Sequence, residues 1–357
     1  MNALTSIGRG VRRDLAPVAI LALMVAAMAL IPAVSSYQVR VNNIYDVFQN
    51  FASLGLVALA LGTTIIAGEF DLSVTSMYLL GGMVAVLTGA SSPVAGVFCA
   101  LAVAVAAGAI QGGLVAGLRL NSMPVTLGGY LILLGITYII GNDKTVTYAN
   151  YSVGLRLDQP ILSVFSIRSL VALGIFVLAA VILDFTRLGR DVRAVGGDRR
   201  ASRIAGVRVA RILVGVFVAA ALMTSLSGAM LGYSLATASP TIALDQLTFA
   251  ATAALLGGVA LTGGRGSPLG IAAGVLALSI LQELLGIVAA ATYVQNLVTG
   301  ALLVVVARSW RPDAFARWLR ERLSLRATSA RPEPPPAAPR PRSGELADPT
   351  VHELKDP

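Results

Sequence analysis

Acidic and polar side chains within otherwise apolar stretches are the residues of this sequence best placed to do chemistry. One group lies in GEFDLSVTS (residues 68–76), between two apolar runs, and another pair interrupts a later run. Ionisable groups at membrane depth are costly and usually functional. Together with a tyrosine in a later polar segment, they are the candidates for a substrate path or gate: Glu69, Asp71, Ser73, Tyr233, Gln282 and Glu283.

Two of the acidic candidates also have a structural interpretation. The carboxylate of Asp71 can cap a helix that begins beside it, because it would accept free backbone N–H groups at the positive end of the helix dipole. Glu283 can make a hydrogen bond between two helices. Both interpretations remain alternatives to a role in the path.

Several kinds of site are excluded by composition. The chain has one histidine, His352, and one cysteine, Cys99, which excludes a protein-built zinc site and a Ser-His-Asp triad within the membrane. Neither of its lysines, Lys144 and Lys355, stands in a Gly-Lys-Ser/Thr phosphate loop. We therefore expect no enzymatic activity, no metal and no cofactor in this chain.

The arginine-rich segment TRLGRDVRAVGGDRRASRIAGVRVAR (residues 186–211) contrasts with its apolar surroundings. Asp198 can cap a helix start and Gly206 can end the helix in the left-handed conformation, which predicts two helical turns over 199–205. Small apolar side chains would share one face of this helix: Ala201, Ile204 and Ala205. So short a helix is not stable alone in water, so it needs a surface to lie against.

The elements that position these residues are membrane helices. Mean hydropathy is +0.79 and only 13% of residues are charged, which is typical of a chain that lives in lipid. The apolar runs are continuous rather than alternating, which predicts an all-α, polytopic protein with about ten (eight to ten) spans. The runs lie at residues 16–34, 47–66, 72–89, 93–117, 124–141, 162–183, 211–231, 245–262, 269–288 and 291–307.

The distribution of positive charge predicts the orientation. If both termini are cytoplasmic, the inner segments hold 23 of the 27 Lys and Arg residues, including all eight arginines of 186–211. The remainder lie outside: Arg40, Lys144, Arg156 and Arg168. The net charge of +9 then reflects inner loops facing an anionic leaflet and needs no nucleic acid.

Composition divides the chain into four parts. Residues 1–15 are a cytoplasmic N-terminus, and 16–307 form the transmembrane domain with 186–211 as its long cytoplasmic loop. Residues 308–326 place apolar side chains at helical spacing among arginines, which predicts an interfacial amphipathic helix. Residues 327–357 form a proline-rich cytoplasmic tail with too little apolar surface to fold.

Three motifs in order resemble the ribose-type permeases of ABC importers, the membrane subunits of sugar uptake systems. They are GEFDLSVTS, the run TRLGR…AVGGD…ASRIAGV, and LLGGVALTGGRGSPLG (255–270). The resemblance extends over residues 44–307 and implies a prokaryotic plasma-membrane protein, a separate ABC ATPase, an extracytoplasmic sugar-binding protein and a second permease copy. It implies a coupling helix within 189–206, contacting the ATPase through Gly189, Arg190, Ala194, Gly196, Gly197, Asp198, Ala201, Ile204, Ala205 and Gly206.

Other functions remain as alternatives. Permeases for branched-chain amino acids have a similar architecture, although FDLSV favours the sugar branch. An ion-coupled secondary transporter would use Glu69, Asp71 and Glu283 for its ion but gives no reason for the capped helix. A membrane scaffold would be supported only by the tail. The glycines of 257–266 lack the lysine of a phosphate loop and are better explained by close helix packing.

Overall fold

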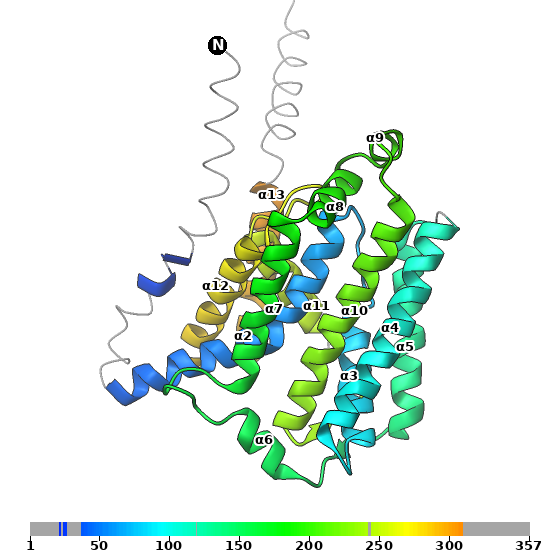
Figure 1. Ribbon diagram of the computed structural model, residues 1–357. Helices are drawn as coiled ribbons and strands as arrows, with labels where there is room; N and C mark the ends of the chain where they lie inside the picture. The colour runs from blue at the N-terminus through cyan, green and yellow to red at the C-terminus, as the bar shows by residue number, and fades with distance from the viewer. Residues whose placement is uncertain (1–20, 23, 27–36, 119, 242–243, 310–357) are drawn as a thin grey trace, which may run out of the picture. The chain divides into compact units, whose positions relative to one another are not determined.

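The computed structural model describes residues 21–22, 24–26, 37–118, 120–241 and 244–309 (Figure 1). Most of the predicted first span (16–34) lies outside these ranges. So do the predicted amphipathic helix and tail, apart from the first two residues of 308–326.

The described chain is mostly helical, and a helix occupies each apolar run predicted between residues 47 and 307. Within the described residues, six helices are long and apolar enough to cross a membrane, with the π-helical turn η2 (Val181–Phe185) extending one of them, α7. These six are α2 (Tyr37–Ile66), α4 (Pro93–Gly117), α5 (Ser122–Gly141), α7 (Ile167–Ala180), α10 (Val209–Ser234) and α12 (Pro268–Ile287).

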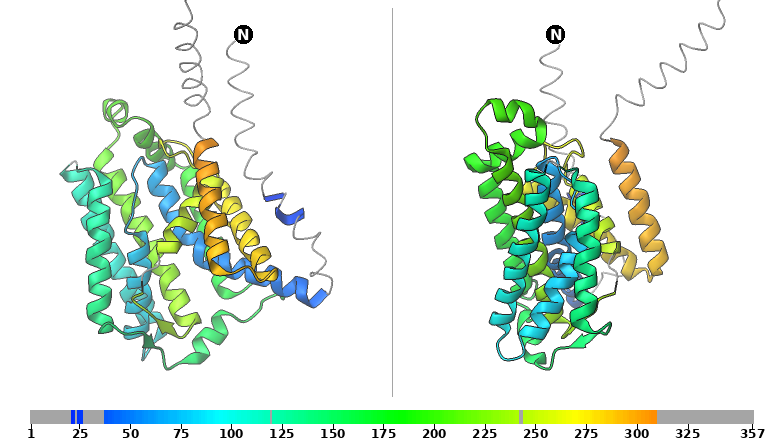
Figure 2. Two further views of the ribbon diagram at one scale, coloured as in Figure 1. Left: turned by 180° about the vertical axis from the view of Figure 1, so that it is seen from behind. Right: turned by 90° about the vertical axis from the view of Figure 1, so that its right-hand side faces the viewer.

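Three further apolar runs form shorter helices. α3 (Val74–Thr88) has 15 residues, α11 (Leu244–Leu256) has 13, and α13 (Thr292–Ser309) lies at the edge of the bundle (Figure 2). A spanning helix needs about 20 residues. The predicted run 72–89 agrees with α3 to within two residues at each end. The predicted run 245–262 extends six residues past the end of α11, because hydropathy does not register the glycines that turn the backbone.

Irregular segments adjoin the two shortest of these apolar helices, α3 and α11. Residues 67–73 precede α3 and residues 257–267 follow α11, and both contain glycines with positive φ, among them Gly68 at +79° and Gly258 at +91°. Backbone outside helices is tolerated at membrane depth only where protein or water satisfies it. Here the hydroxyl of Thr126 serves this role, since it accepts the N–H of Leu72 at 3.1 Å.

Local caps set two of the helix starts. Ser92 and Ser267 occupy the N-cap positions of α4 and α12, and each is followed by a proline at the first helical position. The Ser267 hydroxyl accepts the N–H of Gly270 at 3.1 Å. Proline lacks the N–H that a helix start would leave unpaired, so Ser-Pro divides neighbouring apolar runs into separate helices.

α10 lies at the centre of the bundle and packs against α2, α3 and α4. The α3–α10 crossing depends on small residues, since a Cβ on Gly228 would lie 1.9 Å from the Tyr78 carbonyl oxygen and one on Gly82 would lie 2.9 Å from the Gly228 oxygen. Close backbone approach of this kind is the usual way in which helices pack within a membrane.

Short elements close the end of the bundle opposite α8 (Arg187–Gly197) and α9 (Arg199–Ile204) (Figure 1). They are α6 (Tyr151–Leu157) and an antiparallel pair of two-residue strands, β1 (Val146–Thr147) and β2 (Thr237–Ala238). The buried Tyr148 hydroxyl donates to the Gly89 carbonyl at 2.9 Å, which joins this layer to the end of α3. Burial raises the pKa of the Tyr148 phenol.

Candidate functional site

The arginine-rich segment folds into two helices, α8 and α9, separated by Asp198 alone. Asp198 Oδ1 accepts the N–H groups of Arg200 at 2.7 Å and Ala201 at 3.0 Å, which is an N-cap. Gly206 has φ +85° and stands just past the end of α9. The predicted short helix, its cap and its stop are confirmed, with Ala205 at the C-cap position.

α8 is a helix that the sequence interpretation missed. Its buried face consists of Gly189, Val192 and Val195, and half of its other residues are charged. The signal was present, since Leu188, Val192 and Val195 follow the i, i+4, i+7 spacing of an amphipathic helix. The glycines and arginines of this segment give it the composition of a loop, and this obscures the spacing.

Arg193 holds α8 against two neighbouring segments. Its guanidinium donates to the Leu183 carbonyl at 2.6 Å and pairs with Asp184, both in η2. It also donates to the Gly266 carbonyl at 3.3 Å in the segment after α11. α8 is therefore fixed both to the end of α7 and to the glycine-rich turn.

Four glycines from three parts of the chain meet at the end of α8: Gly68, Gly196, Gly263 and Gly264, named here the glycine junction. A Cβ on Gly196 would lie 1.9 Å from the Ile66 carbonyl oxygen, and one on Gly263 would lie 2.6 Å from the Gly196 oxygen. The Gly264 N–H donates to the Ile66 oxygen at 2.9 Å. The backbone of α8 thus rests directly on the end of α2 and on the turn after α11.

Glu69 lies beside the glycine junction and pairs with α9. The Arg199 guanidinium donates to the Glu69 carboxylate and, at 3.3 Å, to the Gly68 carbonyl oxygen. The Glu69 side chain is 4% exposed, whereas that of Arg199 is 37% exposed. The structure therefore joins Glu69, a predicted path residue, to the predicted coupling segment.

The predicted coupling residues divide into two groups. Gly189, Gly196 and Asp198 hold the helices through packing or capping. The others present a surface that the described chain leaves uncovered, with Ile204 81% exposed. The exposed members are Arg190, Ala194, Gly197, Ala201, Ile204, Ala205 and Gly206.

A second polar group is buried between α3, α4 and α5. The Ser73 hydroxyl lies 2.6 Å from Asp71 Oδ1 and 2.8 Å from Gln111 Oε1, and the Ser73 N–H donates to Asp71 at 2.9 Å. The prediction that Asp71 caps the following helix is wrong in position, because Ser73 is the N-cap residue of α3. Asp71 instead fixes the turn before α3. Gln111, a lone amide within an apolar helix, was not among the predicted site residues.

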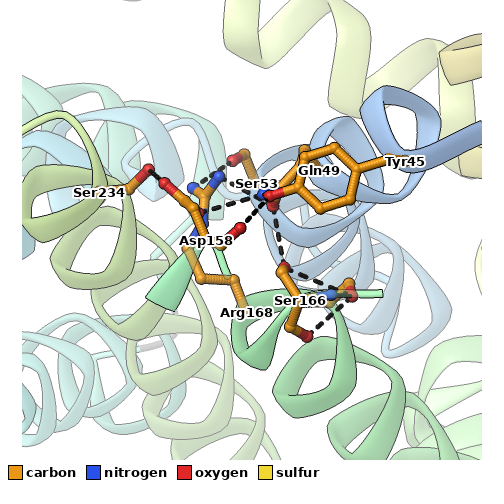
Figure 3. Close-up of polar contacts among 8 residues, drawn as sticks. Tyr45, Gln49, Ser53, Asp158, Ser166, Arg168 and Ser234 are labelled. Atoms are coloured by element: carbon orange, nitrogen blue, oxygen red, sulfur yellow. Dashed lines mark hydrogen bonds and ion pairs between the residues drawn. The ribbon is translucent and has the colours of Figure 1, made fainter. Parts of the chain in front are cut away.

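A third polar group lies at the α6 end of the bundle and joins α2, α7 and α10 (Figure 3). Asp158 accepts Arg168 Nε at 2.7 Å and Gln49 Nε2 at 3.1 Å, while Arg168 Nη2 donates to Gln49 Oε1 at 3.0 Å. Arg168 is 5% exposed. We call this the Asp158 cluster: Tyr45, Gln49, Asp158, Ser166, Arg168 and Ser234. The overlooked sequence signal for this cluster was Arg168, an arginine within the apolar run 162–183.

The remaining predicted path residues lie elsewhere. Tyr233 is buried on α10 and donates to the carbonyl oxygens of Ala85 at 2.8 Å and Pro93 at 2.9 Å, which ties α10 to α3 and to the start of α4. Gln282 and Glu283 are partly buried on α12. The six predicted path residues therefore do not form one polar cluster in the described part of the chain.

Comparisons with known proteins place the chain in a family. Residues 43–307 match the family described as branched-chain amino acid transport system / permease component. The L-arabinose ABC transporter permease protein of Azospirillum brasilense is 30% identical over 74% of this chain and 78% of its own length. The ribose import permease protein of Escherichia coli is 30% identical over 79% of this chain and 90% of its own length. The fructose import permease protein of Rhizobium meliloti is 28% identical over 77% of this chain and 78% of its own length.

No solved structure matches the chain. The family match extends from α2 to α13 and so contains the predicted coupling segment, the glycine junction and both buried polar groups. The chain therefore belongs to the family of transport-system permease components that this match defines, as its three motifs predict.

Proposed function

We propose that this chain is the membrane subunit of an ABC importer for a monosaccharide, driven by a separate ATPase. The observation that carries the proposal is the pair of helices α8 and α9, which are anchored on the bundle and whose exposed face is not covered by the described part of the chain. Relatives named as permeases for ribose, arabinose and fructose support a sugar over an amino acid. Glu69 is paired with Arg199, which weakens the case for an ion-coupled transporter that uses this carboxylate.

The ATPase would contact the exposed face of α8 and α9. Ala201, Ile204 and Ala205 form its apolar part, and Arg190 and Arg200 flank it with positive charge. An exposed apolar side chain on a six-residue helix gains nothing until a partner covers it. Movement imposed there would reach α2 and α11 through the glycine junction.

The proposed topology places α8, α9 and both termini on the cytoplasmic side of a prokaryotic plasma membrane, with about ten spans. The arginines of 186–211 favour this orientation. Two copies of the permease and an extracytoplasmic binding protein would complete the importer. The proposed residues of the substrate path or its gate are Asp71, Ser73, Gln282 and Glu283. Tyr233 would support the helices beside this path.

The test is ATP hydrolysis in lipid nanodiscs that contain this chain, the ATPase and the binding protein encoded beside it, with a panel of sugars. Hydrolysis should rise with one loaded binding protein. An arginine at the centre of the proposed contact, Ala205→Arg, should reduce that stimulation at least about tenfold, because it blocks close approach and adds like charge.

Ala149→Arg is the matched control, since Ala149 is exposed in the loop at the opposite end of the bundle. Both variants should assemble equally in the membrane. Wild-type stimulation in Ala205→Arg would show that α9 does not contact the ATPase, and transport driven by an ion gradient alone would refute the importer.

A further inference from the structure

An apolar cavity of about 500 Å³ lies on the side of the bundle formed by α7, α8 and α10, with α2 and α4 contributing to its wall. These three helices face the viewer in Figure 1. The lining is apolar except for Thr63 on α2 and Arg211 on α10. A sugar needs many hydrogen-bond partners, so this lining does not suit one.

The cavity is open to the surroundings of the bundle. Leu178 and Leu188 line it and are each 58% exposed, and Ile182 is 37% exposed. A Cβ at Gly215, in the cavity wall, would meet no atom within 4 Å. In a protein of the lipid bilayer, an apolar opening of this kind can accept a hydrocarbon chain.

Positive charge borders one end of the cavity. Arg211 stands in the first turn of α10, beside α8 with its arginines, and in the described part of the chain its guanidinium makes no hydrogen bond or ion pair. Basic pockets between helices on the cytoplasmic side bind anionic lipid head groups. We infer that an anionic phospholipid binds here, with its phosphate at Arg211 and an acyl chain in the cavity.

The bound lipid would also touch the coupling segment. Leu188 and Val192 of α8 form part of the cavity wall, opposite Ile212 and Val216 of α10. An acyl chain between them would stabilise the position of α8 relative to α10. This consequence for coupling rests on the proposed function, whereas the binding site itself does not. A second permease copy suits the cavity less well, because it would bury Arg211 against an apolar wall.

Lipid binding can be measured on the full chain alone, by native mass spectrometry after purification from membranes that contain phosphatidylglycerol and phosphatidylcholine. Gly215→Leu fills the cavity and should abolish the retained lipid. Gly113→Leu on α4 is its control, since a Cβ there also meets no atom within 4 Å and Gly113 does not line the cavity. It should retain lipid at the wild-type level.

The head-group contact has its own pair of variants. Arg211→Gln should reduce the preference for phosphatidylglycerol over phosphatidylcholine about fivefold, the factor expected from one arginine near an anionic surface. Arg208→Gln removes the same charge three residues away, from a residue that does not line the cavity, and should change the preference less.

Equal lipid retention in Gly215→Leu and Gly113→Leu would overturn the inference, as would equal head-group preference in the two arginine variants. A photocrosslinker at residue 215 that captures a second permease copy instead of lipid would show that the cavity is an interface between copies. Because no ATPase is present, failure here is distinguishable from failure of the importer proposal.

Discussion

Arg199 is the residue through which the predicted coupling segment reaches a buried carboxylate. Its guanidinium is partly exposed, but its partner Glu69 is almost fully enclosed. A buried carboxylate that loses its counter-charge keeps its desolvation cost without compensation. The pair is therefore of more consequence for the position of α9 than a surface ion pair would be.

Replacing Arg199 tests this pair. Arg199→Gln should lower the free energy of unfolding by about 1–3 kcal/mol, measured by thermal unfolding of the purified permease in detergent. Arg200→Gln, an adjacent exposed arginine, should change it by less than about 0.5 kcal/mol. The double variant Glu69→Gln/Arg199→Gln should recover part of the loss, because no uncompensated charge remains. A double variant no more stable than Arg199→Gln would show that the pair is not coupled.

At the glycine junction, α2, α8 and the segment after α11 approach one another through their backbones. Gly196 is the residue that permits this, since it lies in α8 directly against the Ile66 carbonyl. Where side chains are absent from a contact, they cannot rearrange to absorb a displacement. The glycine junction is thus suited to transmit motion of α8 to two membrane segments at once.

Two neighbouring glycines give a matched test of the junction. A methyl group at residue 196 would force the segments apart, so Gly196→Ala should destabilise the protein by about 1–3 kcal/mol. Gly197→Ala should be neutral or stabilise by up to about 1 kcal/mol, because a Cβ there meets no atom within 4 Å. The measurement is thermal unfolding of both variants. Equal stabilities would show that α8 does not lie this close to the Ile66 carbonyl in solution.

At the scale of the whole molecule, polar contacts hold the two ends and apolar packing holds the middle. The glycine junction and the Glu69–Arg199 pair are near one end, and the Asp158 cluster is near the other (Figures 1 and 3). Between them α10 packs on α2, α3 and α4 mainly through small and apolar side chains, and the hydroxyls of Ser225 and Ser227 add one hydrogen bond each to α4 and α2. The Asp158 cluster joins segments more than 100 residues apart, so it fixes the connections at that end onto the bundle.

The Asp158 cluster predicts a difference between two arginines. Arg168→Gln removes the charge that Asp158 faces and should reduce stability by about 1–3 kcal/mol, allowing for the partial exposure of Asp158. Arg156→Gln on α6 removes an exposed arginine and should have little effect. Limited proteolysis of the loop between α6 and α7 should accelerate only in Arg168→Gln. Identical cleavage rates would argue that the cluster does not secure this loop.

The sequence by itself determined the solvent, the helical class and the short capped helix within the arginine-rich segment. These properties depend on composition and on residues a few positions apart, such as Asp198 and the N–H groups it caps. Tertiary structure alone decided that Glu69 pairs with Arg199, 130 positions away, and that Gly196 rests on Ile66. It also decided where α11 stops. Hydropathy registers whether a residue prefers lipid or water, whereas these features depend on which backbones approach closely enough to exclude a side chain.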